Sequence, residues 1–428
     1  MNIILQISKT IWIFGILIIL SVTNCSKVNE SLPLIDIEAN TNNMQVVNLS
    51  EFADNIRYVQ LEHNEKYLIS GISHVDIAEN WILLSGGDHC LLYDSEGNFV
   101  SKIGKRGRGP GEYSVAVDIG FSGGENQKIY ISTTYDLFEY DLNGSFIKKH
   151  TNSFLVNDIY YLRYRYIITD SLLFGFINNR SGNVEYKALI INKSGDVKLM
   201  YKNYVFFNNE SGKAFEGVPN FCKFKGTPYF KEQFNDTLFS LNENYEPIPR
   251  YVFNLGSLKL PLSIRTRFPM GEIVMNYIFI DHIFQTENHL ILGCNFGNRF
   301  PAKRLTSKPS IFPGGEPMWI NTTGILGLFN KKTEELVFIK PSNTDNPLFT
   351  SGFYNDIDCG PRFFPQVMMN DSTMLMWVSP DRLKSHVASD DFKENIPKYP
   401  EKKKQLEEMA NSLTVFDNPV LMIATFKK

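Results

Sequence analysis

A short hairpin pattern recurs along this chain of 428 residues and limits the folds that the chain can adopt. Each copy has an apolar run, an Asp or Asn, a Gly or its substitute shortly afterwards, and a second apolar run. A turn of this kind reverses a strand at low cost, because the polar side chain bonds to nearby backbone and glycine accepts a positive φ. The pattern therefore predicts β-hairpins at residues 91–100, 137–147, 189–197, 238–245 and 328–333.

The spacing of the copies predicts the fold class. With Tyr93, Tyr140, Ile191, Leu241 and Phe329 taken as equivalent, successive copies lie 47, 51, 50 and 88 residues apart. A period of ~40 to 50 residues with several strands per unit is typical of a β-propeller. Hydrophobic residues make up 43% of the chain and aromatic residues 13%, which is enough to bury stacked sheets. We therefore predict an all-β, six-bladed propeller of four-stranded antiparallel blades.

The first five blades can be laid out from strand-length runs separated by turn residues. The first blade has Ile72–Ala78, Trp81–Ser85, His89–Tyr93 and Asn98–Ile103, and the second has Ala116–Phe121, Lys128–Thr133, Leu137–Tyr140 and Ser145–Lys149. The third, fourth and fifth cover about 157–201, 205–253 and 275–339. The fifth contains a Pro- and Gly-rich insertion, Arg299–Trp319, and long loops of this kind are often functional.

The sixth blade is incomplete at the C-terminal end. Its expected strands are Asn355–Phe364, Thr373–Val378 and Pro419–Phe426, with a partly helical interruption at Asp381–Leu413. An outermost strand is missing, and we predict that Ile56–Leu61 supplies it. This pairing of the two chain ends would close the ring and protect its edges.

The N-terminus carries a secretory signal. Lys9 precedes the apolar run Ile11–Leu20, which is shorter than a span of ~20 residues. The following Val22–Cys25 resembles the lipobox of bacterial lipoproteins, in which the Cys becomes the lipidated first residue, although Asn24 departs from the usual small residue. We predict a signal peptide at 1–25, a polar tether at 26–55 and the propeller at 56–428. The alternative is a signal peptide or uncleaved anchor with an incidental Cys25.

Charge and cysteine content exclude some function classes. A formal charge of -3 and a pI near 6.2 argue against binding of nucleic acid or an anionic membrane surface by the whole body. The mixed charges at 401–408 indicate a solvated helix face. Zinc spacing is absent from the remaining cysteines, so no metal or cofactor is predicted, and disulfides or buried free thiols both stay open. These cysteines are Cys90, Cys222, Cys294 and Cys359.

The loop Gly104–Tyr113 is the first candidate site. Its glycines surround Lys105, Arg106 and Arg108, so exposed amides and cations could form an anion-binding nest. No Ser or Thr follows Gly104-Lys105, so the loop is not a P-loop. The alternative is a blade-to-blade turn in which Glu112 neutralises an arginine. The candidate binding residues are Lys105, Arg106, Arg108, Glu112 and Tyr113.

A second candidate is a polar cluster in the sixth blade. If Asn355–Phe364 is a strand, Asp356 and Asp358 share one face, where paired carboxylates could bind calcium or act as acid and base. The alternative is that they hydrate the channel or pair with Arg362. Local hydrolase and metalloprotease motifs are absent from the sequence, so catalytic residues stay unknown.

The chain resembles the six-bladed propeller lipoproteins abundant in gut Gram-negative bacteria, which are related in style to NHL-repeat propellers. The resemblance covers about Tyr58–Phe426 and rests on the segments Tyr58–Glu62, Leu92–Phe99, Gly104–Tyr113, Phe234–Phe239 and Asp417–Ile423. It implies the fold and an exported, lipid-anchored protein of the outer membrane. The activity of that family is mostly unknown.

These observations lead to three functional hypotheses. The first is an envelope-anchored, monomeric binding or scaffolding propeller, which presents rim loops, chiefly Gly104–Tyr113 and Arg299–Trp319, to a ligand or envelope protein. The second is a carbohydrate-active hydrolase or lyase with its site in the central channel. The third is a sensory or assembly partner within an envelope complex.

Overall fold

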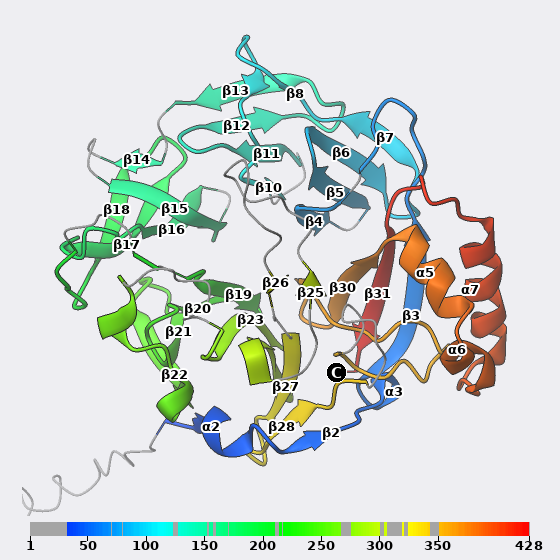
Figure 1. The fold of residues 1–428 in the computed structure, drawn as a ribbon. Helices are drawn as coiled ribbons and strands as arrows, with labels where there is room; N and C mark the ends of the chain where they lie inside the picture. The colour runs from blue at the N-terminus through cyan, green and yellow to red at the C-terminus, as the bar shows by residue number, and fades with distance from the viewer. Residues whose placement is uncertain are drawn as a thin grey trace, which may run out of the picture. The chain divides into compact units, whose positions relative to one another are not determined.

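Six antiparallel sheets are arranged in a ring, as the sequence predicts (Figure 1). The computed structural model describes residues 32–427 except 70, 79, 123–126, 152–153, 157–159, 170, 210–213, 216, 267–274, 300–303, 306–318, 321–323 and 343–350. Cys25 and most of the Arg299–Trp319 insertion lie outside these residues. Residues 34–428 form one compact unit. The all-β, six-bladed architecture with four-stranded blades is therefore confirmed.

The first three blades follow one another along the chain. Blade one contains β4 (His74–Ala78), β5 (Trp81–Gly86), β6 (His89–Asp94) and β7 (Phe99–Lys102). Blade two contains β10 (Asp118–Phe121), β11 (Ile129–Ser132), β12 (Leu137–Tyr140) and β13 (Phe146–His150). Blade three contains β15 (Tyr160–Ile167), β16 (Leu172–Ile177), β17 (Tyr186–Asn192) and β18 (Val197–Lys202), with β14 (Leu155–Val156) paired to β15.

The last three blades include the chain end. Blade four contains β19 (Asn220–Phe224), β20 (Thr227–Lys231), β21 (Thr237–Leu241) and β22 (Pro247–Asn254). Blade five contains β23 (Phe279–Gln285), β24 (His289–Asn295), β27 (Gly324–Asn330) and β28 (Leu336–Ile339). Blade six contains β29 (Val367–Asn370), β30 (Thr373–Val378), β31 (Val420–Phe426) and β3 (Ala53–Gln60).

The ring closes through β3. This strand pairs antiparallel with β31, from Ala53 opposite Phe426 to Gln60 opposite Val420. The prediction that Ile56–Leu61 completes the sixth blade is therefore confirmed.

The residues before β3 line the outer edges of two further blades. β1 (Leu34–Asp36) pairs parallel with β22, and β2 (Met44–Gln45) pairs parallel with β28. The short helices α2 (Ile37–Asn40) and α3 (Leu49–Phe52) connect these strands. Residues 34–60, here called the belt, thus follow the outer edges of blades four, five and six in turn (Figure 1, blue).

The belt differs from the polar tether expected for 26–55. From Leu34 onward this range packs on the propeller, because Ile35, Ile37 and Leu49 are fully buried among the strands that they cross. The edges that the belt covers include β28, whose sequence Leu336–Ile339 carries no charge. By contrast β13 and β18 are the outer strands of their described sheets and carry lysines, a common protection against edge-to-edge pairing.

The recurring hairpins all connect the third strand of a blade to the fourth. In the first copy the Asp94 carboxylate accepts the backbone N–H groups of Glu96 and Asn98, both at 2.9 Å, and Gly97 has a φ of +91°. Asn242 forms the same bonds at 3.0 and 2.8 Å in blade four, where Tyr245 adopts a φ of +61° in place of glycine. The turn survives there although the glycine is replaced.

The long connections all leave from one face of the ring. Because strands alternate in direction, the links between second and third strands share a face with the links between blades. This face, here called the insertion face, carries α5 (Pro380–Val387), α6 (Asp390–Glu394), α7 (Pro400–Ser412) and the strand pair β25 (Arg304–Leu305) and β26 (Trp319–Ile320). It also carries β8 (Lys105–Arg106), β9 (Glu112–Tyr113) and short 3-10 turns at Gly256–Leu258, Leu262–Ile264 and Gly297–Arg299.

The inner strand of blade six is not the predicted one. Asn355–Phe364 forms turns and isolated bridges, and β29 pairs with β30 instead. The cause is local, because the Asp358 carboxylate accepts the backbone N–H of Gly360 at 2.8 Å and so holds a turn just before Pro361.

Candidate functional site: a pocket between blades three and four

A pocket of about 490 Å³ opens on the insertion face between blades three and four. This volume lies within the range of ~300–1,000 Å³ that is usual for small-molecule sites. Its walls come from β15, the end of β16, the starts of β17 and β21, and the segments that follow β16, β18, β20 and β22. The lining residues are Tyr164, Phe176, Ile177, Asn178, Asn179, Lys187, Asn203, Tyr204, Val205, Gly217, Pro219, Glu232, Gln233, Phe234, Asn235, Asp236, Thr237, Lys259 and Arg265.

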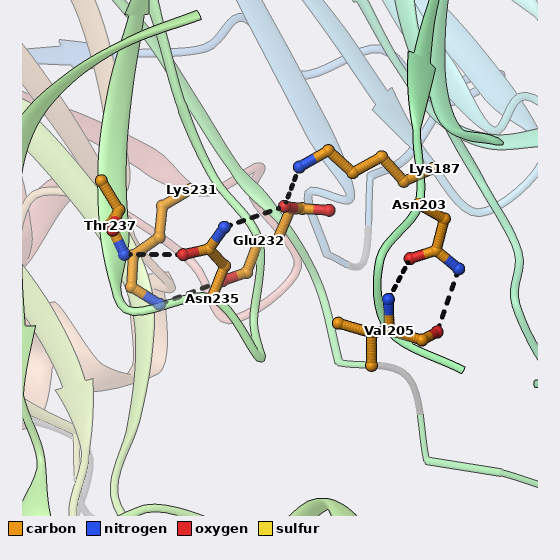
Figure 2. A network of polar contacts seen from close by, with 7 residues as sticks. All are labelled: Lys187, Asn203, Val205, Lys231, Glu232, Asn235 and Thr237. Carbon is orange, nitrogen blue, oxygen red and sulfur yellow. Dashed lines mark hydrogen bonds and ion pairs between the residues drawn. The ribbon is translucent and has the colours of Figure 1, made fainter. Parts of the chain in front are cut away.

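An ion pair joins the two blades across the pocket (Figure 2). Lys187 on β17 lies 2.8 Å from the Glu232 carboxylate, which follows β20. Asn235 supports this carboxylate with its amide nitrogen at 3.4 Å, and its amide oxygen accepts the Thr237 N–H at 3.0 Å. The β20–β21 connection is therefore held in one shape, with its carboxylate directed toward blade three.

A second ion pair leaves one buried acceptor without a donor. Lys259, after β22, lies 2.6 Å from Oδ2 of Asp236. The other oxygen, Oδ1, is buried and has no hydrogen-bond partner among the residues that the structure describes. The amide oxygen of Asn178 on the facing blade is also buried and has no hydrogen-bond partner in the described part of the chain. Leaving such an acceptor buried without a donor costs about 1–3 kcal/mol, so a ligand that donates to both would gain from them.

Lys231 lies at the end of β20, directly before the pocket residues. Its side chain is 1% exposed, and its ammonium donates to the Glu232 carbonyl at 3.1 Å (Figure 2). Burial lowers the pKa of Lys231 to about 8, against the raising effect of the nearby Asp236. A lysine in this condition is partly neutral near physiological pH.

An exposed aromatic side chain stands at the pocket mouth. Tyr204 is 81% exposed, and Asn203 fixes the backbone around it. The Asn203 amide donates to the Val205 carbonyl at 3.0 Å and accepts the Val205 N–H at 3.0 Å (Figure 2). The backbone at Tyr204 is thus held in place, although the Tyr204 ring is exposed to solvent.

Arg265 forms part of the pocket wall. Its guanidinium lies 4.5 Å from the Phe207 ring centroid and 4.6 Å from that of Phe234, and its Nε donates to the Phe215 carbonyl at 2.6 Å. Stacking between two rings fixes the planar cation. Arg265 thereby connects the segment after β18 to the β20–β21 connection.

The predicted loop Gly104–Tyr113 forms internal contacts instead of an open nest. Lys105 pairs with Glu112 at 3.3 Å, and Arg106 pairs with Asp88. The Glu112 carboxylate accepts the Gly109 N–H at 2.9 Å. This hydrogen bond is the main cause that lowers the pKa of Glu112, and the contact with Lys105 is the next. Glu112 thus neutralises a lysine where the sequence suggested an arginine, and it occupies the place of an anion.

The other two residues of that loop lie apart. Arg108 is exposed, and Tyr113 is buried with a hydroxyl that has no partner in the described part of the chain. The cavity beside Arg106 and Tyr113 is small, about 40 Å³. Binding by this loop stays a prediction.

The predicted polar cluster of blade six does not converge. Asp356 accepts the N–H and hydroxyl of Ser50, at 2.9 and 2.5 Å, and so holds α3. Asp358 accepts the Tyr58 hydroxyl at 3.1 Å and the Asn355 amide at 2.7 Å, and burial raises its pKa. Arg362 donates to the Gly352 carbonyl at 3.4 Å. Asp356 and Asp358 fasten the belt to blade six, and they share no strand face because their segment is a turn.

Carboxylates on the first strands of three blades were not expected from the sequence. Burial raises the pKa values of Asp76, Asp118 and Asp281 to about 6. Asp76 on β4 accepts the Phe121 N–H on β10 at 2.7 Å and so links blades one and two. No group of His, Cys, Asp or Glu suited to a metal ion is found among the described residues.

The cysteines are not paired with one another. Cys90, Cys294 and Cys359 are buried free thiols, and Cys222 is a half-buried one. None of the helices within the described ranges has the length and apolar character needed to cross a bilayer.

Sequence reasoning missed the pocket because its lining comes from separate segments that no local pattern connects. One signal was present in the charged run Lys231–Asp236, which interrupts the apolar strands of blade four. The overlapping segment Phe234–Phe239 carries part of the family resemblance and contains no chemical motif.

Comparison with known proteins supports the fold. A family model described as a domain of unknown function, DUF4934, matches residues 32–425. No curated protein sequence matches the chain. The structure is similar to that of a Bacteroides fragilis protein described as exported, at 15% identity and a TM-score of 0.63, over 92% of this chain and 100% of that one.

A second similarity is weaker. A member of the DUF4221 family from Bacteroides vulgatus shares 11% identity at a TM-score of 0.47, over 88% of this chain and 97% of the other. Only the first of these likenesses is close enough to show a common fold.

Proposed function

Since this chain belongs to the DUF4934 family, whose description assigns no activity, we propose a function from its pocket: the protein is a binding propeller that takes a small polar ligand between blades three and four. The observation that carries this proposal is the pair of buried acceptors without donors, Asn178 Oδ1 and Asp236 Oδ1, in a pocket of ligand size. Propellers commonly place such sites on loops held by rigid blades.

Binding is favoured over hydrolysis by the state of the carboxylates. A glycosidase needs one carboxyl group that stays protonated as an acid and a second that is free to act as base or nucleophile. In the described lining, Glu232 is paired with Lys187 and Asp236 with Lys259, so both carboxylates are already engaged within the chain. Neither carboxylate is therefore left free to act as a base or nucleophile.

We place this binding protein in the bacterial envelope as a monomer anchored by lipid at Cys25. The support is the lipobox-like sequence before Cys25 and the likeness to a protein described as exported. Labelling cells with an alkyne palmitate analogue tests the anchor. Wild type is expected to take up label and to partition with membranes, and Cys25→Ala is expected to lose both. Equal labelling of the two proteins would contradict lipidation at this residue.

The pocket is tested by screening small polar metabolites for binding by ligand-detected NMR. We expect ligands that bind wild type to lose affinity for Asn178→Leu and Tyr204→Ala and to keep it for Arg108→Ala. The last variant removes an exposed cation of the Gly104–Tyr113 loop and serves as the control. Loss of binding in Arg108→Ala alone would move the site to that loop.

A further inference from the structure

We infer that the ligand of this pocket is a neutral, polyhydroxylated molecule, namely a short saccharide. This inference rests on the proposed function, because it specifies what the pocket between blades three and four accepts. It follows from three properties of the pocket: its free hydrogen-bonding groups, its charge and its aromatic mouth.

The free groups in the pocket require a donor from the ligand. The other lining asparagines are already bonded within the chain: Asn179 accepts the Val184 N–H and donates to the Val205 carbonyl, both at 3.2 Å. Asn203 and Asn235 are likewise engaged. In the described part of the lining, the buried side-chain acceptors without a hydrogen-bond partner are Oδ1 of Asn178 and Oδ1 of Asp236, on opposite blades. A ligand with several hydroxyl groups can donate to both at once.

The charge of the pocket disfavours ionic ligands of either sign. Among the described lining residues, Lys187, Lys259 and Arg265 outnumber the two carboxylates, and this excess repels an ammonium group. A carboxylate or phosphate ligand can only accept hydrogen bonds, so it would bring lone pairs against the two unpaired acceptors. Hydroxyl groups avoid both conflicts because they are uncharged and donate.

The aromatic residues suit a ring with apolar faces. Tyr204 is 81% exposed at the mouth, and Tyr164, Phe176 and Phe234 line the walls. An exposed tyrosine offers a ligand both an apolar ring and a hydroxyl group, a combination that is enriched at binding interfaces. The C–H faces of a pyranose can lie against such rings while its hydroxyl groups reach the acceptors. One ligand class therefore satisfies all three properties.

The experiment measures binding of a defined panel to the purified chain by isothermal titration calorimetry and ligand-detected NMR. The probes are glucose, galactose, xylose, mannose and their β- and α-linked oligomers, the corresponding uronic acids and amino sugars, and polyamines. We expect a neutral saccharide to bind, and Asn178→Leu and Tyr204→Ala each to weaken it about 10-fold, the effect of one lost hydrogen bond or stacking contact. Tyr204→Phe, which keeps the ring, and Lys148→Ala, which removes an exposed lysine of β13, are expected to bind as wild type does.

Two of the outcomes separate this inference from the proposed function. Preference for uronic acids, amino sugars or polyamines, lost in the same variants, would overturn the inference of a neutral saccharide and leave a binding pocket. Binding of a neutral saccharide that neither variant weakens would overturn the assignment to this pocket. Absence of binding by every probe at millimolar concentration would count against both. Because Tyr204 is exposed, Tyr204→Ala keeps the test valid if Asn178→Leu does not fold.

Discussion

Replacing Lys231 with methionine is expected to stabilise the protein at pH 7. The side chain is buried beside the pocket, and burial lowers the pKa of its ammonium from the ordinary 10.5 to about 8. At pH 7 the ammonium is charged in both folded and unfolded chains, so the full cost of burying the charge is present. Methionine has a similar length and carries no charge to desolvate.

The magnitude follows from the pKa. A difference between 10.5 and about 8 corresponds to about 3 kcal/mol of unfavourable free energy at pH 7. The substitution also removes the bond from the Lys231 ammonium to the Glu232 carbonyl, which is worth about 1 kcal/mol. Lys231→Met should therefore raise the free energy of unfolding by about 2 kcal/mol at pH 7.

The pH dependence has a definite sign. Above pH 8 the folded chain releases the Lys231 proton while the unfolded chain retains it, so the stability of wild type rises with pH. By pH 9 wild type should recover about 1 kcal/mol relative to Lys231→Met. The lowered pKa therefore predicts that the difference in unfolding free energy between Lys231→Met and wild type shrinks as pH rises from 7 to 9.

Urea unfolding followed by tryptophan fluorescence at pH 7 and pH 9 measures both effects. Lys198→Met on β18 is the matched control, since it removes an exposed lysine and should change stability by less than about 0.5 kcal/mol at either pH. The reasoning would be refuted if Lys231→Met were less stable than wild type at pH 7. A gap that stayed constant between the two pH values would refute the assigned pKa.

Two further predictions concern the ring. Gly97→Ala should cost about 3 kcal/mol or more, because Gly97 has a positive φ and an added Cβ would lie 2.4 Å from the Gln60 carbonyl oxygen of β3. Gly87→Ala, also at positive φ but in open space, should cost only about 1 kcal/mol, and equal melting temperatures for the two would contradict the contact with β3. For Asp76, a folded pKa of about 6 means that the folded chain holds a proton that the unfolded chain releases, so wild type gains stability as pH falls. Relative to Asp76→Asn, wild type should gain about 1 kcal/mol between pH 7 and pH 5 in denaturant titrations, and a pH-independent difference would argue for an ordinary pKa.

The blades were predictable because their signals are local. Asp94 and Gly97 sit within one turn, so the sequence alone shows both the residue that accepts the N–H bonds and the one that takes a positive φ. The ring closure by β3 was predictable by counting, since the sixth blade lacked one strand.

The belt and the pocket could not be predicted in this way. β1 and β2 are only three and two residues long, and their partners β22 and β28 lie far along the chain, so no periodicity marks them. The pocket depends on which turns of two blades meet, as with Lys187 and Glu232. The prediction of a strand at Asn355–Phe364 is wrong, because the alternation of its residues resembles β structure while Asp358 fixes a turn.

The belt has a consequence for the order of folding. Its residues are synthesised before the strands that they pair with, so β1 can pair only after β22 exists, β2 only after β28, and β3 only after β31. Contacts of such long sequence separation form late and slowly. A chain that is cut short at any point leaves part of this segment without a partner, and the corresponding blade edges open to proteases and to other chains. The belt is therefore fully paired only in a chain whose synthesis has reached β31.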